Sequence, residues 1–128
     1  MFFKKKNNDK LYGGITAETV IAKGIVIETG EISGTGSVQI EGTFNGNISI
    51  DGHLIVGSTG EVSGEIKARN ALFAGAYSGS VSVDDTVRFC DGSNVKAQVE
   101  ANKIIMDEGA AFDGYITSAK IFQEEAKI

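Results

Sequence analysis

The sequence contains no proline and no tryptophan, and it has one cysteine and one histidine among 128 residues. A chain without proline keeps its backbone N–H donors, which suits a fold made almost wholly of sheet. Because Cys90 is the single cysteine, no intramolecular disulfide can form, and we expect a reducing compartment. No apolar run approaches 18 residues, and the N-terminal lysines precede polar residues. We therefore expect neither a membrane-spanning helix nor a secretory signal.

The scarcity of histidine and cysteine also narrows the chemistry that the chain can perform. His53 follows Gly52 at an expected solvent-facing corner, and one histidine cannot build a site that needs several. Cys90 has no histidine near it in the repeat, which argues against a nucleophile. Acidic pairs such as Asp84-Asp85 fall at expected corners and lack the glycine-aspartate repeat of calcium-binding solenoids. We predict no catalytic residue, no metal and no cofactor.

Charge is distributed unevenly along the chain. Residues 1–10 contain four lysines and one aspartate, a net charge of +3, and the whole chain carries −5, so residues 11–128 carry −8. A body this acidic repels nucleic acid, which is bound by basic faces. The chain also lacks a Walker glycine loop, and Gly34-Thr-Gly36 lacks the third glycine of a dinucleotide fingerprint. We therefore expect neither nucleic acid nor nucleotide as a partner.

A short apolar pattern returns about every 15 to 18 residues. Each unit begins with two apolar residues separated by one, and the first members of these pairs lie 16, 17, 16 and 17 residues apart. The pairs are Val38-x-Ile40, Leu54-x-Val56, Ala71-x-Phe73, Val87-x-Phe89 and Ile104-x-Met106. A period this short is typical of a solenoid of stacked strand coils. It favours a stacking or polymerising unit over an enzyme.

Two further strands complete each expected coil, again with apolar residues at alternate positions. The second-strand positions are Phe44, Val62, Tyr77, Val95 and Phe112, and the third-strand positions are Ile48, Ile66, Val81, Val99 and Ile116. A small residue recurs between them at Gly46, Gly64, Gly79, Ala97 and Gly114, where a bulky side chain would collide with the adjacent coil. We expect Phe44, Tyr77 and Phe112 to stack as a ladder at their shared position.

The predicted fold is therefore an all-β parallel β-helix of about six coils over residues 19–122. A flexible arm over residues 1–18 precedes it and a polar tail over residues 123–128 follows it, both expected to be disordered. Residues 19–36 are predicted to form a distorted first coil without complete second and third strands, and Ile121 to begin a last partial coil. A hairpin meander is the rival architecture, since Asn45-Gly46 is a good hairpin turn. Hairpins do not explain three apolar pairs in the same order in every period.

The ordered succession of coils resembles the bactofilins. The resemblance covers about residues 19–117 and is carried by phrases such as Ser37-Val-Gln-Ile-Glu-Gly-Thr-Phe-Asn-Gly-Asn-Ile48. Met1-Phe-Phe-Lys-Lys-Lys6 is similar to the membrane-targeting segment that many bactofilins carry. The resemblance implies a right-handed β-helix of triangular cross-section that polymerises without nucleotide into non-polar filaments. It also implies a cytoplasmic scaffold on the inner membrane face that influences cell shape and has cell-wall or motility proteins as partners.

The ends of such a solenoid are expected to be uncapped, because the sequence shows no amphipathic helix at either terminus, no proline and no cluster of charges in the last coil. The predicted polymerisation interface contains Phe112, Ile116, Ile121 and Phe122 at the C-terminal end and Val20, Ile25 and Ile27 at the other. Like-with-like junctions at both ends alternate into a filament without polarity. The predicted membrane-binding residues are Met1, Phe2, Phe3, Lys4, Lys5 and Lys6, unless the arm only aids solubility.

Two other functions stay open at the level of sequence. A left-handed hexapeptide-repeat acyltransferase is suggested by Val56-Gly-Ser-Thr-Gly60, although it needs strict six-residue spacing and a catalytic histidine between subunits. A monomeric adaptor would instead bind one partner by strand addition at an open end.

Overall fold

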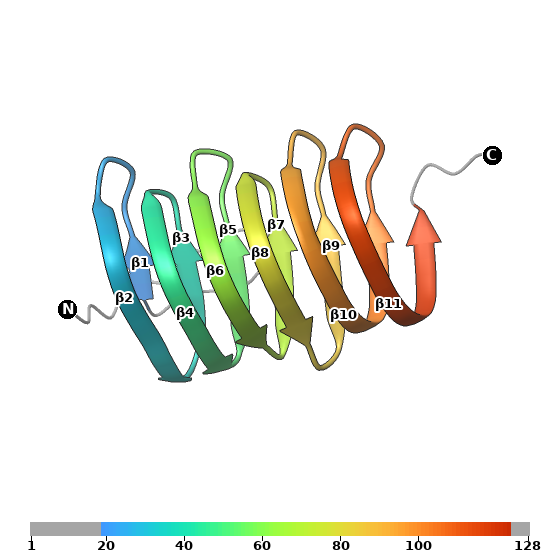
Figure 1. Ribbon diagram of the computed structural model, residues 1–128, viewed down its shortest axis with the longest axis horizontal. Coiled ribbons are helices and arrows are strands. Elements are labelled where there is room, and N and C mark those ends of the chain that lie inside the picture. Colours follow the sequence, from blue (N-terminus) through green and yellow to red (C-terminus); the bar gives the residue numbers. More distant parts are fainter. Residues whose placement is uncertain (1–18, 124–128) are drawn as a thin grey trace, which may run out of the picture.

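The computed structural model describes residues 19–123 as a parallel β-solenoid, in which the chain winds through stacked coils (Figure 1). Its strands are β1 (Thr19–Ile21), β2 (Val26–Thr35), β3 (Val38–Ile40), β4 (Thr43–Asp51), β5 (His53–Val56), β6 (Glu61–Ala68), β7 (Asn70–Phe73), β8 (Ala76–Val83), β9 (Thr86–Phe89), β10 (Asn94–Met106) and β11 (Ala111–Gln123). Every pairing between them is parallel. The all-β solenoid is thus confirmed, and the antiparallel hairpin meander is excluded.

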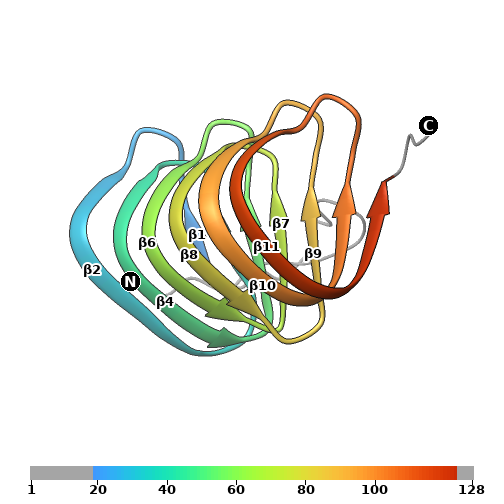
Figure 2. The same cartoon turned by 45° about the vertical axis from the view of Figure 1, so that its right-hand side comes forward.

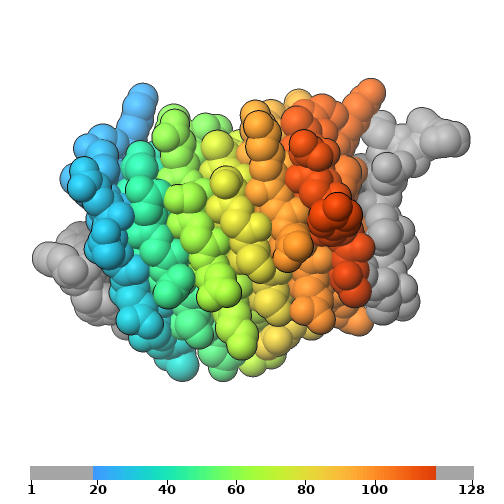
Figure 3. Space-filling model, in the orientation of Figure 1, coloured from blue at the N-terminus to red at the C-terminus, as the bar shows by residue number. Residues whose placement is uncertain are grey.

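The short strands β1, β3, β5, β7 and β9, continued by the last residues of β10 and β11, form one side of the solenoid, and the longer strands curve round the other (Figure 2). The longer segments β2, β4, β6, β8, β10 and β11 each belong to one coil, which gives six coils. Figure 3 shows them as bands that follow the order of the sequence. The predicted arm and the last five residues, 124–128, lie outside the described residues, and so does the predicted membrane-targeting segment 1–6.

Strand register confirms the repeat that the sequence predicts. Along the short strands Val38 pairs with Leu54, Leu54 with Ala71, Ala71 with Val87 and Val87 with Ile104. The second-strand row runs Phe44, Val62, Tyr77, Val95, Phe112, and the third-strand row runs Ile48, Ile66, Val81, Val99, Ile116. These rows line the interior of the solenoid, and their residues in the middle coils are buried.

The second and third strands of each coil form one continuous strand that bends at the recurring small residue. Gly46, Gly64, Gly79 and Gly114 take up φ angles of 148°, 125°, 141° and 147°, a region that favours glycine. The bend therefore lies inside a continuous strand, and the backbone pairing with the adjacent coils continues through it. A Cβ on Gly64 would overlap the carbonyl oxygen of Gly46 in the adjacent coil. The expected collision is confirmed, and close approach of backbones explains the small residue.

The first coil is more complete than predicted. β2 has ten residues, and in it Ile27 pairs with Phe44 and Ile32 with Ile48, so both the second and third strands are present. The register shifts between Ile27 and Gly30, where β2 contains one residue more than β4. This bulge moves the apolar pair out of its usual spacing, which is why the sequence pattern looked incomplete.

An aromatic stack runs through the core, but it is not the predicted ladder. Tyr77 packs on Phe73 with ring centroids 5.1 Å apart, Phe73 on Phe89 at 5.7 Å, and Phe89 on Phe112 at 5.3 Å. Valines separate the aromatic residues of the second-strand row, so the prediction of a ladder at one position was wrong. The rings instead contact those of the neighbouring short strands, which share the same interior.

Candidate self-association surfaces

The two rims of the solenoid are formed by edge strands. β1 and β2 terminate the order of strand pairing at one rim, and β11 pairs with β10 alone at the other. Among residues 19–123 no strand covers the outer edges of these three. An uncovered edge presents backbone N–H and C=O groups that can pair with another chain. Both rims are therefore templates for strand addition.

At the C-terminal rim, the apolar rows of the core continue into β11, but no further coil of the described chain packs over them. Phe112 and Ile116 are half-buried and pack against the core, whereas Val95 and Val99 in the same rows are only 0% and 3% exposed. Ile121 pairs by backbone register with Ile104, a core position. β11 runs over 13 residues, and its pairing with β10 shows no shift of register. This rim is a long, regular edge beside apolar side chains.

The N-terminal rim is more irregular. Ile27 and Ile32 are half-buried against the core, while Ile25 and Val26 are 50% and 60% exposed. The bulge after Ile27 interrupts the edge of β2, and bulges are a common way to blunt an edge strand. We conclude that β2 is a poorer template for pairing than β11.

The structure separates the residues predicted to form the polymerisation interface. Phe112, Ile116 and Ile121 belong to core rows at one rim, and Ile27 belongs to a core row at the other. Ile25 lies at a corner, where its carbonyl accepts a hydrogen bond from the Thr43 N–H at 2.9 Å. The remaining two are not in register with a core row: Val20 pairs with Gln39, and Phe122 pairs with Ile105.

Ile32 belongs with this rim, but the sequence prediction did not include it in the interface. Its row is that of Ile48, and it is half-buried because no coil covers it from the N-terminal side within the described chain. The signal that would identify it is its pairing with Ile48. In the sequence that pairing is hidden by the one-residue offset of the bulge.

The cysteine and the histidine are poorly placed for catalysis. Cys90 is half-buried, and burial, together with Asp107, raises the pKa of its thiol despite the nearby Arg88. The thiol form is thereby favoured over the nucleophilic thiolate. His53 is half-buried on the short-strand side rather than solvent-facing as expected. No group of three potential metal ligands occurs in the part of the chain that the structure describes.

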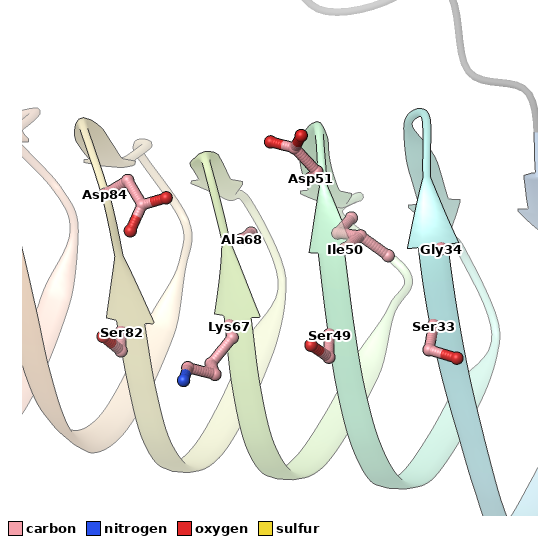
Figure 4. Close-up of a pocket in the computed structure, with 9 residues that line it drawn as sticks. All are labelled: Ser33, Gly34, Ser49, Ile50, Asp51, Lys67, Ala68, Ser82 and Asp84. Carbon is pink, nitrogen blue, oxygen red and sulfur yellow. The ribbon is translucent and has the colours of Figure 1, made fainter.

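A shallow hollow of about 500 Å³ crosses the outer surface near the ends of β2, β4, β6 and β8. Figure 4 shows Ser33, Ser49, Lys67 and Ser82 in one line across successive coils, as their strand register requires. Asp51 above this line forms an ion pair with Arg69, and both side chains are more than half exposed. Ser33, Ser49 and Lys67 are exposed, so the hollow is an open polar groove on the surface.

The chain matches a protein-family model described as "Bactofilin: Polymer-forming cytoskeletal" over residues 19–117. It is 35% identical to bactofilin BacO of Myxococcus xanthus (strain DK1622) over 102 residues, which cover 80% of this chain and 80% of that protein. It is 24% identical to bactofilin BacP of the same organism over 98 residues, 77% of this chain and 40% of BacP. It is 46% identical to bactofilin BacN over 54 residues, 41% of this chain and 47% of BacN. No solved structure gives a significant match.

These similarities agree with the solenoid and with its uncovered rims. The matched range is also the range over which the sequence resembles the family. The family is cytoskeletal and non-enzymatic, so the prediction that the chain is not an enzyme is confirmed and the acyltransferase alternative is removed. The described residues contain no helix able to cross a membrane. The chain belongs to the bactofilin family of polymer-forming cytoskeletal proteins.

Proposed function

We propose that this protein polymerises end to end, without nucleotide, into filaments that have no polarity. Support comes first from the core rows, which are buried in the middle of the solenoid and half-buried at the described rims. A second subunit at each rim would bury Phe112 and Ile116, or Ile27 and Ile32, as an inner coil buries its neighbour. Complete burial of one such side chain is worth about 1.5–3 kcal/mol.

The difference between the two rims favours like-with-like junctions. A two-fold axis at the C-terminal rim sets β11 antiparallel to the β11 of a second subunit, and antiparallel pairing is fully compatible with a sheet. The bulged edge of β2 is a poor match for the regular edge of β11, which argues against joining unlike rims. Alternating the two kinds of junction gives a filament whose ends are equivalent.

Electron microscopy of the purified protein without nucleotide tests this proposal. The wild type is expected to form long fibres, whereas Phe112→Arg places a charge in the junction and should raise the concentration needed for assembly by about 100-fold or more. Asp113→Arg is the matched control, because Asp113 lies next in β11 but is exposed on an outward row. Circular dichroism should show the same sheet content in all three proteins.

Two outcomes of this experiment would contradict the proposal. Normal fibres from Phe112→Arg would contradict the assignment of β11 to the junction. Small monodisperse particles from the wild type would contradict polymerisation and favour an adaptor that binds one partner by strand addition.

The same proposal extends to a membrane-attached, cytoplasmic scaffold. Residues 1–6 combine two phenylalanines with three lysines, and near an anionic leaflet each lysine adds about 1 kcal/mol. One arm would bind weakly and reversibly. A filament presents many arms, and their combined avidity would produce stable attachment to the inner face of the membrane. Cell-wall or motility proteins are the partners that such a scaffold would organise.

A further inference from the structure

The free edge of β11 directs backbone groups toward the C-terminal rim at every second residue. In a parallel strand, successive residues point their N–H and C=O groups alternately to the two neighbouring strands. The Ala111 N–H donates to the Ser93 carbonyl at 2.9 Å, so Ala111 points back into the solenoid. By this alternation Phe112, Gly114 and Ile116 point their backbone groups toward the rim, where no strand of the described chain pairs with them.

The same edge is bent at Gly114. This residue continues the row of bends, pairs with Ala97 and has a φ of 147°. Figure 2 shows β11 following the curve of the strands behind it. Two curved strands stay adjacent along their whole length only where their bends coincide. A two-fold axis through Gly114 meets this condition, since it places the bend of one β11 on the bend of another.

We propose that β11 pairs antiparallel with β11 of a second copy about a two-fold axis through Gly114, so that Phe112 lies opposite the partner's Ile116. The proposal rests on the end-to-end polymerisation proposed above and specifies the register of its C-terminal junction. Each junction contains this contact twice, because Ile116 lies opposite the partner's Phe112 as well.

This register places apolar side chains of the core opposite one another. Phe112 and Ile116 are half-buried and pack against the core, and the ring of Phe112 lies 5.3 Å from that of Phe89. Val95 and Val99, in the same rows but with a coil on both sides, are 0% and 3% exposed. A second β11 supplies the side that is missing at the rim.

The register also satisfies the backbone groups of the edge. Residues that point toward the rim lie opposite residues that do the same, as an antiparallel hydrogen-bonded pair requires. These pairs are Phe112 with the partner's Ile116, Gly114 with the partner's Gly114, and Ile116 with the partner's Phe112. Each pair exchanges two hydrogen bonds, about six in all.

The neighbouring registers are less favourable. A slide of one residue sets inward side chains against outward ones. A slide of two in one direction places Asp113 directly opposite the partner's Asp113, and like charges in that position are destabilising. A slide of two in the other direction places Ile116 opposite the partner's Gly114 and Phe112 opposite position 118 of the partner. Either slide of two also moves the two bends apart.

On the outer surface, the proposed register brings two kinds of exposed residue together. Asp113 lies opposite the partner's Tyr115, which is 74% exposed in the single chain, and Ala111 lies opposite the partner's Thr117. These are non-hydrogen-bonded pairs, in which the Cα atoms are about 4.5 Å apart. A disulfide accepts Cα separations of about 4.4–6.8 Å, so cysteines at these positions can be joined.

Disulfide trapping in the full-length protein tests the register. Asp113→Cys and Tyr115→Cys, each combined with Cys90→Ser, are purified in reductant, mixed, assembled and then oxidised. Non-reducing electrophoresis should show linked dimers in the mixture and about tenfold fewer from either protein alone, because identical positions are then diagonal neighbours about 7–8 Å apart.

A second pair of substitutions checks the same register independently. Ala111→Cys mixed with Thr117→Cys should also give linked dimers. Ala111→Cys mixed with Tyr115→Cys is the matched control and should give about tenfold fewer, since these positions are diagonal neighbours in the proposed register. All four positions are exposed in the single chain, so fibres should persist in the reduced samples.

The alternative outcomes separate the register from polymerisation itself. Links from Asp113→Cys alone, or from Tyr115→Cys alone, would show a slide of two residues in one direction or the other and overturn the proposal. Fibres without links in any sample would show that β11 does not pair with β11, and would leave polymerisation standing. Loss of fibres only in the cysteine variants would contradict the outward placement of these residues. Absence of fibres from the wild type would contradict the proposed function.

Discussion

At the scale of single residues, the glycine at each bend shows how closely the coils approach. The Gly64 backbone lies against the Gly46 carbonyl, and Gly79 and Gly114 meet Gly64 and Ala97 in the same way. Each of these glycines therefore meets two requirements, a positive φ angle and the absence of a Cβ. The structure allows these requirements to be separated by substitution.

Gly64→Ala should be strongly destabilising. It incurs both the backbone cost of a positive φ, about 1–3 kcal/mol, and a collision that requires the coils to move apart. Gly34→Ala is the matched control, because Gly34 has a φ of 141° but no atom within 4 Å of its Cβ position. Thermal unfolding at equal protein concentration should give a clearly lower midpoint for Gly64→Ala than for Gly34→Ala. Equal midpoints would mean that close approach is unimportant.

Tyr77 is the second residue whose role can be tested alone. Its hydroxyl oxygen lies 2.6 Å from the Gly64 carbonyl oxygen and 2.7 Å from that of Ser80, so the buried hydroxyl has acceptors. Burial raises the pKa of Tyr77 well above its usual 10, although the hydrogen bond to Ser80 opposes the shift. The folded protein thus favours the neutral phenol.

The sign of the resulting pH dependence follows from proton binding. Above about pH 10 the unfolded chain loses the Tyr77 proton and the folded chain keeps it, so stability should fall by about 1.4 kcal/mol per pH unit. Tyr77→Phe should remove this part of the alkaline slope and cost about 1 kcal/mol at neutral pH. Tyr115→Phe, at a side chain 74% exposed, should change neither. An unaltered slope in Tyr77→Phe, measured by urea unfolding from pH 8 to 11, would contradict this account.

At the scale of elements, the two rims determine the kind of polymer that can form. β11 is long and regular, whereas β2 is bulged. If like rims join, a substitution at one rim leaves the other junction intact. Phe112→Arg should therefore give dimers, and Phe112→Arg combined with Ile27→Arg should give monomers, when measured by analytical ultracentrifugation. A polar filament would instead give monomers from Phe112→Arg alone.

Strand register could be predicted from the sequence for particular reasons. A slip of one residue would turn Val38 and Ile40 outward and Gln39 inward, so the two-residue period specifies each pairing. The position of the bend could be predicted from Gly46 and its equivalents, but its form could not. The backbone pairing between strands continues through these residues, whereas the sequence indicated two separate strands. The bulge in β2 could not be predicted, because an extra residue only has meaning beside the partner strand β4.

At the scale of the whole molecule, residues 1–10 carry a net positive charge and the rest of the chain a net negative one. Deleting residues 1–6 should abolish co-sedimentation with anionic vesicles, since it removes two phenylalanines and three lysines. Filaments should persist in the same preparation, as seen by electron microscopy. Deleting residues 124–128 should leave vesicle binding intact. Unchanged pelleting of the first variant with vesicles would remove the membrane anchor from the proposed function.

By itself, the sequence determined the period, the rows of the core and the places where coils approach too closely for a side chain. These properties depend on local alternation and on single residues such as Gly64, so they can be read along the chain. Only the tertiary structure showed which rim is regular, how the aromatic rings stack, and that Ile55 is buried although it does not belong to a core row. Burial and edge exposure depend on what lies beside a residue in the stack, and its neighbours there are about 16 residues away in sequence.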